Sequence, residues 1–235
     1  MQIGIIAEGK GDCAVLQNIL WSVLKDEDDV RFLRPEFDLD ETDLQDSAYK
    51  TMTEDEFSSW TLVQKDCAHQ TKLQSFLVDD NIFAEERKLI IQIDTAECEL
   101  ENYEVIRPTK DANYCTNLRT AVINKINTWL SNLYSEQLYY AVCIEEMEAW
   151  LLPLYEAKDS SKHADPKRKF EALVRKKRST DKNFNKKVQA LSQKSEFEKM
   201  DFYSADFKKS KKLKNALKYN QSLSDFVISL KPILT

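Results

Sequence analysis

The chain has 235 residues, of which 42% are hydrophobic and 31% charged, a balance that excludes a disordered protein. No apolar run approaches the roughly 18 to 20 residues that span a bilayer, so we expect no contact with a membrane. The first residues form an apolar run without a basic leader or a cleavage site, and we therefore expect a cytoplasmic protein. Five scattered cysteines with no C-x-x-C pair indicate reduced thiols rather than disulfides or a zinc site.

The net charge of −6 hides a division of the chain into an acidic and a basic part. Residues 1–157 hold 13 basic and 31 acidic side chains, whereas residues 158–218 hold 20 basic and 8 acidic ones. A basic segment of this kind is typical of contact with a polyanion, although a solvated helical surface that binds nothing has the same composition. The candidate contacts to a nucleic-acid backbone are Lys167, Arg168, Lys169, Arg175, Lys176, Lys177, Arg178, Lys208, Lys209, Lys211 and Lys212.

In chain order, the first predicted elements are a strand, a turn and a helix. Residues 3–7 (IGIIA) form the short apolar run that is typical of a strand buried on both faces. The run AEGKGD follows and holds Gly9 and Gly11, two of only three glycines in the chain, which predicts a tight functional turn. A helix is predicted from Ala14, with Asp12 as its N-cap.

The next predicted elements are less regular. Residues 26–59 are acidic and have no clear period, so we predict loops there. Residues 59–65 (SWTLVQK) predict a second strand, and residues 67–81 predict a helix. Residues 88–95 (KLIIQIDT) predict a third strand that ends in an aspartate.

The remaining elements continue the alternation of helices and strands. An amphipathic helix is predicted from Asn113, a fourth strand at residues 137–144 (QLYYAVCI), and a helix directly after it (EEMEAWLLPLYEA). This alternation predicts an α/β fold with a mostly parallel sheet and helices on both faces. From residue 158 onward we expect two to four lysine-rich helices, the last of which docks on the sheet.

Acidic side chains follow three of the predicted strands. Glu8 follows the first, Asp94 ends the third, and Glu148 lies in the helix after the fourth. Since ligands collect at the carboxyl ends of parallel strands, we expect these groups to meet. Clustered carboxylates repel one another unless a cation shares them, and Mg²⁺ or Mn²⁺ prefers such oxygen ligands. A bound ion of this kind activates water for phosphodiester hydrolysis.

Two other interpretations of these residues stay open. Glu and Asp after a strand are common as turn or helix-cap residues without any chemistry. The EGKGD turn before a helix also has the form of an anion-binding loop, although the G-x-x-x-x-G-K-[ST] pattern is missing.

Three motifs together, IIAEGKGDCAVL, LIIQIDTAE and EMEAWLL, resemble the Toprim-type α/β domain. The nearest variants are those of the overcoming-lysogenization-defect (OLD) nucleases and the RloB-like bacterial proteins. The resemblance covers residues 1–155 and implies a Toprim-like, Rossmann-like parallel sheet with a Mg²⁺-dependent phosphodiester site. Residues 156–235 would then form a basic helical extension that packs on this domain.

The resemblance also implies which residues form the site. The glutamate after the first strand of the family matches Glu8, the first aspartate of its D-x-D motif matches Asp94, and the glutamate of an E-x-W-L motif matches Glu148. These three are the catalytic candidates. The second acid of D-x-D falls at Ala96, so Glu97 or Glu99 would have to replace it. The expected metal ligands are Glu8, Asp94, Glu97 and Glu148.

Together these features predict a metal-dependent nuclease or related phosphoryl-transfer enzyme that acts on DNA or RNA. The resemblance implies a role in bacterial defence against phage, with an ATPase encoded nearby as partner. The alternative is a catalytically inactive Toprim-like module that binds nucleic acid or a partner protein.

Overall fold

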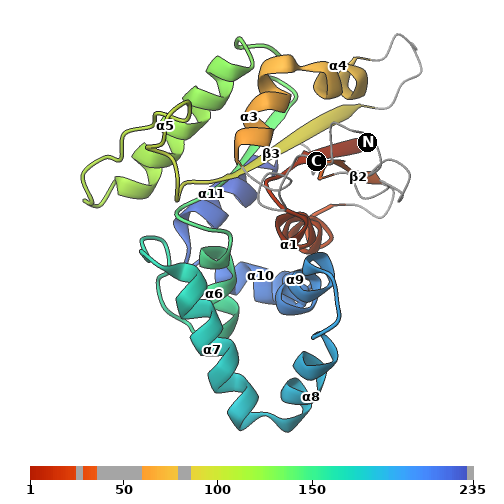
Figure 1. Cartoon of the computed structure of the whole chain (residues 1–235), viewed down its shortest axis with the longest axis vertical. Helices are drawn as coiled ribbons and strands as arrows, with labels where there is room; N and C mark the ends of the chain where they lie inside the picture. The colour runs from red at the N-terminus through yellow and green to blue at the C-terminus, as the bar shows by residue number, and fades with distance from the viewer. Residues whose placement is uncertain (25–28, 36–59, 79–85, 232–235) are drawn as a thin grey trace.

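The centre of the fold is a sheet of parallel strands in the spatial order β2-β1-β3-β4. The computed structural model describes residues 1–24, 29–35, 60–78 and 86–231, and within them it shows an α/β fold (Figure 1). The strands of this sheet are β1 (Gln2–Ile6), β2 (Asp29–Arg34), β3 (Arg87–Asp94) and β4 (Leu138–Cys143). The predicted α/β class with a parallel sheet is confirmed.

Both faces of the sheet are covered by helices, because the strands are apolar on both faces. Ile3 and Ile5 face one buried core, whereas Ile6 faces the other. In Figure 1 the helices α3, α4 and α5 lie on one side of the sheet, and α1, α6 and most of the C-terminal helices lie on the other. Their bounds are α1 (Lys10–Leu20), α3 (Trp60–His69), α4 (Thr71–Leu77), α5 (Tyr114–Trp129) and α6 (Glu148–Tyr155).

The prediction of the second strand was wrong. Residues 60–65 of the run SWTLVQK belong to α3, where Trp60, Val63 and Cys67 recur at helical spacing and are buried against the sheet. The second strand is β2 instead, whose residues DVRFLR pair with β1 and remain partly exposed. Loops were therefore wrongly predicted for residues 29–34, and residues 26–28 and 36–59 of that acidic stretch lie outside the described residues.

The glycine-rich turn differs from its prediction as well. Gly9 is the N-cap of α1 with an extended backbone (φ −136°), so it needs no left-handed conformation. Asp12 is the third residue of the helix rather than its cap, and its Oδ2 accepts a hydrogen bond from the Gly9 N–H at 2.9 Å. A Cβ on Gly11 would lie 3.0 Å from Cγ of Met200, so this glycine lets α9 (Glu196–Ser204) approach α1.

The C-terminal helices share one buried core with the sheet. Phe170, Phe207 and Phe226 are buried in the same cluster as Ile3 and Ile5. The described part of this region has five α-helices and a 3₁₀ helix, more than predicted: α7 (Pro166–Thr180), α8 (Lys182–Ala190), α9 (Glu196–Ser204), η2 (Ala205–Lys208), α10 (Ser210–Ala216) and α11 (Gln221–Ser229). The division into residues 1–155 and 156–235 stays a prediction.

The last helix docks on the sheet as predicted. α11 contacts β4 and α5, and the Phe226 ring stacks on Trp150 with centroids 5.5 Å apart. All five cysteines are buried and free, which agrees with the prediction of reduced thiols. Within the described ranges, no helix is both long and apolar enough to cross a membrane.

Candidate functional site

The carboxyl ends of β1, β3 and β4 bring acidic residues from distant parts of the chain to one edge of the sheet. Glu8 follows β1, Asp94 ends β3, and Glu148 begins the helix after β4. The Asp94 backbone N–H donates to Glu8 Oε1 at 2.6 Å, so the first two predicted site residues are in direct contact. The convergence expected for parallel strands is thus present.

Gln92 holds Glu8 and Asp94 in position from the buried interior of β3. Its Oε1 accepts a hydrogen bond from the Glu8 backbone N–H at 2.9 Å, and its Nε2 donates to Asp94 Oδ1 at 2.8 Å. The second oxygen of Asp94, Oδ2, accepts from the Met147 backbone N–H at 3.2 Å. A buried glutamine with both amide ends satisfied gives two partly buried carboxylates one defined geometry.

Asp12 joins this group, a position that the sequence analysis treated as a helix cap. The pKa of Asp12 is raised to about 7, mainly by burial and in addition by the nearby charges of Glu148 and Glu196. The Gly9 N–H and the charge of Lys167 act in the opposite direction. Asp12 is therefore an ionisable neighbour of Glu148 as well as the third residue of α1.

Burial raises the pKa of the other acids of the cluster, and the charges of neighbouring acids add to this effect. Burial raises the pKa of Glu8 well above its usual range, and the charges of Asp12 and Glu97 add to this effect. Burial also raises the pKa of Asp94, followed by the charges of Glu8, Asp12 and Glu148. The pKa of Glu148 is raised for the same first reason. We call Glu8, Asp12, Asp94 and Glu148 the carboxylate cluster.

The turn after β3 carries the position at which the D-x-D motif departs from the family. Ala96 and Glu97 are both exposed there, and Glu97 acts on Glu8 through its charge. Glu99, the other predicted substitute, instead pairs with Arg107, with its Oε2 3.4 Å from Nε. Of the two candidates, Glu97 is thus the one near the carboxylate cluster.

An arginine that the sequence analysis missed fixes the loops beside the cluster. Arg107 donates from Nη1 to Glu145 Oε1 at 2.7 Å and from Nη2 to Oε2 at 3.0 Å, a bidentate pair. It also donates to the backbone oxygens of Thr95 and Ala96. Glu145 therefore neutralises Arg107 rather than joining the cluster. The two residues lie 38 positions apart, and no local pattern connects them.

Among the predicted nucleic-acid contacts, Lys167 lies nearest to the cluster. Its charge lowers the pKa of Asp12 and of Glu148, and its backbone N–H donates to Glu146 Oε2 at 3.2 Å. The N-terminus of α7 is thereby held against the loop that follows β4. One basic side chain is thus within electrostatic reach of the carboxylates.

Several other predicted contacts already have acidic or aromatic partners. Lys169 pairs with Glu156 at 2.9 Å, and Lys177 lies 4.9 Å and 4.5 Å from the ring centroids of Tyr155 and Phe184. Three more pairs are Arg168 with Asp165, Lys208 with Asp201, and Lys209 with Asp206. The exposed basic side chains include Arg175, Lys176, Arg178, Lys211 and Lys212.

The donor set of the carboxylate cluster suits a hard divalent cation. Its groups are carboxylates, repulsion between them raises the pKa values, and a cation shared by Glu8, Asp12 and Asp94 would remove that repulsion. In the arrangement described, however, no three His, Cys, Asp or Glu side chains of residues 1–24, 29–35, 60–78 and 86–231 form a group ready to hold a metal ion. The Mg²⁺ or Mn²⁺ cofactor stays a prediction.

Comparison of the chain with protein-family models, curated proteins and solved structures finds no match in any of the three. The resemblance to the Toprim-type domain therefore rests on the three sequence motifs.

Proposed function

We propose that this protein is a metal-dependent nuclease that hydrolyses phosphodiester bonds at the carboxylate cluster. The observation that carries the proposal is the convergence of Glu8, Asp12, Asp94 and Glu148 at the carboxyl edge of the sheet, where Asp94 N–H contacts Glu8 at 2.6 Å. Acids that serve only as turn or cap residues have no reason to gather from three separate segments of the chain.

Each member of the site has a defined part in this proposal. Glu8, Asp12 and Asp94 hold Mg²⁺ or Mn²⁺, with Glu97 and Glu148 as supporting ligands. When bound, such an ion neutralises charge on the phosphate and activates water. Gln92 positions Glu8 and Asp94 through its two hydrogen bonds.

Lys167 and the lysine-rich helices supply the affinity for the polyanion. Lys167 lies within electrostatic reach of Asp12 and Glu148, which suits a contact to the phosphate under attack. The exposed cations of α7 and α10, such as Lys176 and Lys212, would contact phosphates further along the strand without reading sequence.

Calorimetric titration with Mn²⁺ tests the site without a known substrate. We expect the wild-type protein to bind Mn²⁺, and Glu8→Gln, Asp12→Asn and Asp94→Asn to bind it at least tenfold more weakly, because each removes one anionic ligand. The matched control is Glu171→Gln, which changes an exposed carboxylate on α7. No Mn²⁺ binding by the wild-type protein, or equal loss in the control, would refute the metal site.

A cleavage assay tests the chemistry itself. Labelled single-stranded and duplex DNA and RNA are incubated with Mg²⁺, with Mn²⁺ or with EDTA. We expect cleavage of at least one substrate that depends on the metal and fails in Glu8→Gln. Cleavage that persists in EDTA would contradict the proposal.

A second candidate function is a catalytically inactive module that binds nucleic acid or an ATPase partner. Ala96 at the second D-x-D position favours it, as does the lack of a formed metal-ligand group among the described residues. In this case, binding would persist in EDTA and would be indifferent to Glu8→Gln, while no metal would bind and no substrate would be cut.

A further inference from the structure

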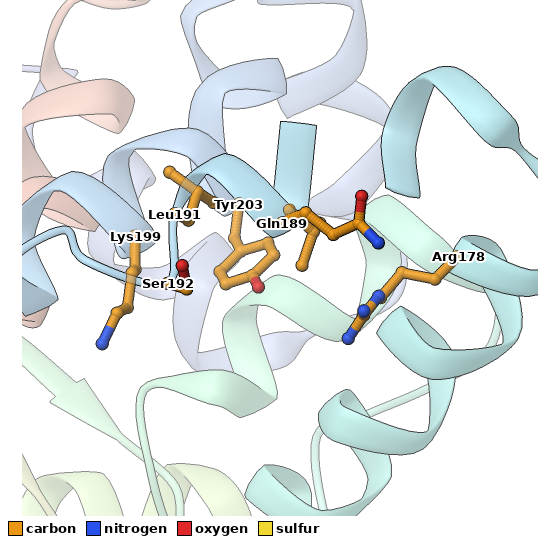
Figure 2. Close-up of a pocket in the computed structure, with 7 residues that line it drawn as sticks. Arg178, Gln189, Leu191, Ser192, Lys199 and Tyr203 are labelled. Carbon is orange, nitrogen blue, oxygen red and sulfur yellow. The ribbon is translucent and has the colours of Figure 1, made fainter. Parts of the chain in front are cut away.

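A pocket of about 520 Å³ lies between α7, α8 and α9, among the lysine-rich helices. Its apolar lining comes from Val188 and Leu191, and its charged lining from Arg178 and Lys199. Figure 2 shows Tyr203 between these two cations in the view, with side chains of all three helices and of the turn after α8 around it. A pocket of this volume is large enough for a small-molecule ligand such as a nucleotide.

Tyr203 is held rigidly as part of the pocket wall. Its ring packs against Phe170 and Phe202, with centroids 5.4 Å apart in each pair, and its backbone oxygen accepts a hydrogen bond from the Tyr155 hydroxyl at 3.0 Å. The ring remains partly exposed. A fixed, partly exposed aromatic ring is the usual stacking surface for an unpaired base.

The two cations are placed for the phosphates of such a ligand. Arg178 Nε donates to Asn185 Oδ1 at 3.0 Å, which orients the guanidinium group, and the charge of Arg178 acts on the Tyr203 hydroxyl. Lys199 lies on the same helix as Tyr203, one turn before it. Gln189 and Ser192 add hydrogen-bonding groups to the pocket lining. An apolar wall, an aromatic ring and two cations together match a base and its phosphates.

The pocket is adjacent to the carboxylate cluster through the first turn of α9. A Cβ on Gly11, which directly precedes Asp12, would lie 3.4 Å from Cγ of Glu196 on that turn. The charge of Glu196 also raises the pKa of Asp12 and of Tyr203. Glu196 is therefore within electrostatic reach of both places. Its own charge is offset by Lys199, whose Nζ lies 3.7 Å from its Oε2. A strand held in the pocket would continue toward the cluster over this turn.

We propose that the pocket holds one unstacked nucleotide of a single-stranded nucleic acid, with its base on Tyr203 and its phosphates at Arg178 and Lys199. The inference deepens the proposed nuclease function and rests on it, because that function makes the bound strand the substrate. It names the substrate class as single-stranded rather than duplex, because a base must leave its stack to reach Tyr203.

Fluorescence anisotropy with a labelled 12-nucleotide oligo(dT) or oligo(U), in EDTA at low salt, tests the pocket on the full chain. We expect Tyr203→Leu to weaken binding roughly 5- to 100-fold through loss of stacking, and Tyr203→Phe to stay within twofold because it keeps the ring. Arg178→Gln should weaken binding several-fold. Lys218→Gln, an equal charge change at an exposed position after α10, should stay within twofold.

Competition identifies the ligand. An unlabelled duplex of equal length should displace the oligonucleotide at least tenfold less well than the unlabelled single strand. Equal competition by the duplex, no binding by the wild-type protein, or equal affinity of wild-type and a folded Tyr203→Leu variant would overturn the proposal. If free dTMP displaced the labelled oligonucleotide at the same concentration as the unlabelled strand, the pocket would be a site for a free nucleotide. That result would overturn the proposal that it holds a nucleotide of a single strand.

This test is separate from that of the nuclease. We expect Glu8→Gln and Asp94→Asn to keep or strengthen oligonucleotide binding, because in EDTA each variant removes a negative charge that no metal ion offsets. A variant that loses Mn²⁺ binding but still binds the oligonucleotide would have its defect at the carboxylate cluster. A variant that binds Mn²⁺ but loses the oligonucleotide would have its defect in the pocket.

Discussion

The carboxylate cluster and the lysine-rich helices carry opposite charge, and the fold positions them by different means. The acids come from three separate segments of the chain, and hydrogen bonds from backbone N–H groups and from the Gln92 amide hold Glu8 and Asp94 next to each other. The lysines come from one continuous stretch, and many are exposed or paired on their own helices. Chemistry at one phosphate needs the first kind of placement, whereas sequence-independent affinity needs only the second.

The largest effect should come from the cluster. Glu8→Gln keeps an acceptor for the Asp94 N–H but removes the charge, so we expect the metal-dependent cleavage rate to fall about 100-fold or more. Steady-state cleavage rates at saturating Mg²⁺ check this, with Glu171→Gln as control. A loss of less than fivefold would mean that the convergent acids are no more important than the distributed lysines.

The next effect concerns the ion pair of Arg107 with Glu145, which fixes the loops beside the carboxylate cluster. Arg107→Leu leaves the buried Glu145 carboxylate unpaired, and we expect a loss of roughly 3 kcal/mol in the free energy of unfolding. Urea unfolding followed by circular dichroism measures it. The double variant Arg107→Leu with Glu145→Leu removes both charges and should be less destabilised than the single variant. The opposite order would show that the pair contributes no more than packing.

The pH dependence of stability distinguishes a repelling cluster from a solvated surface. The pKa of Asp12 is about 7 in the fold against an ordinary 3.8, so its contribution to stability is full at low pH and is lost as the pH rises through about 7. Metal-free protein should therefore be less stable at pH 8 than at pH 5.5.

Asp12→Asn removes this charge and keeps an acceptor for Gly9 N–H, so it should stabilise the metal-free protein at pH 8 by about 1 to 2 kcal/mol, after allowance for solvent screening. Thermal unfolding in EDTA at both pH values checks it. If Asp12→Asn were only as stable as the wild-type protein at pH 8, the ionised Asp12 would not be repelled by its neighbours in the cluster.

The smallest effect should come from single lysines. Lys176→Gln removes an exposed charge, and we expect a several-fold loss of nucleic-acid affinity and a salt dependence whose slope falls by about one. Lys169→Gln should have less effect, because Lys169 already pairs with Glu156 at 2.9 Å. Anisotropy titrations at several salt concentrations compare the two. Equal losses would show that the ion pair with Glu156 does not limit the contact of Lys169 with phosphate.

The sequence by itself determined the parts of this protein that depend on local pattern. The runs at residues 3–7 and 88–95 are short and rich in isoleucine, a pattern typical of buried strands, and the acid at the end of each therefore lies at the carboxyl edge of the parallel sheet. The division of charge at residue 158 is a matter of composition alone. These features predicted the α/β class, Glu8, Asp94 and the basic helices.

Only the tertiary structure decided features that depend on distant partners. SWTLVQK is short enough to fit a strand or a helix, and its burial against the sheet made it α3. β2 was hidden because an edge strand in the described sheet keeps polar side chains. Arg107 with Glu145 and the pocket around Tyr203 join segments that no local pattern connects, because packing rather than sequence distance brings their side chains together.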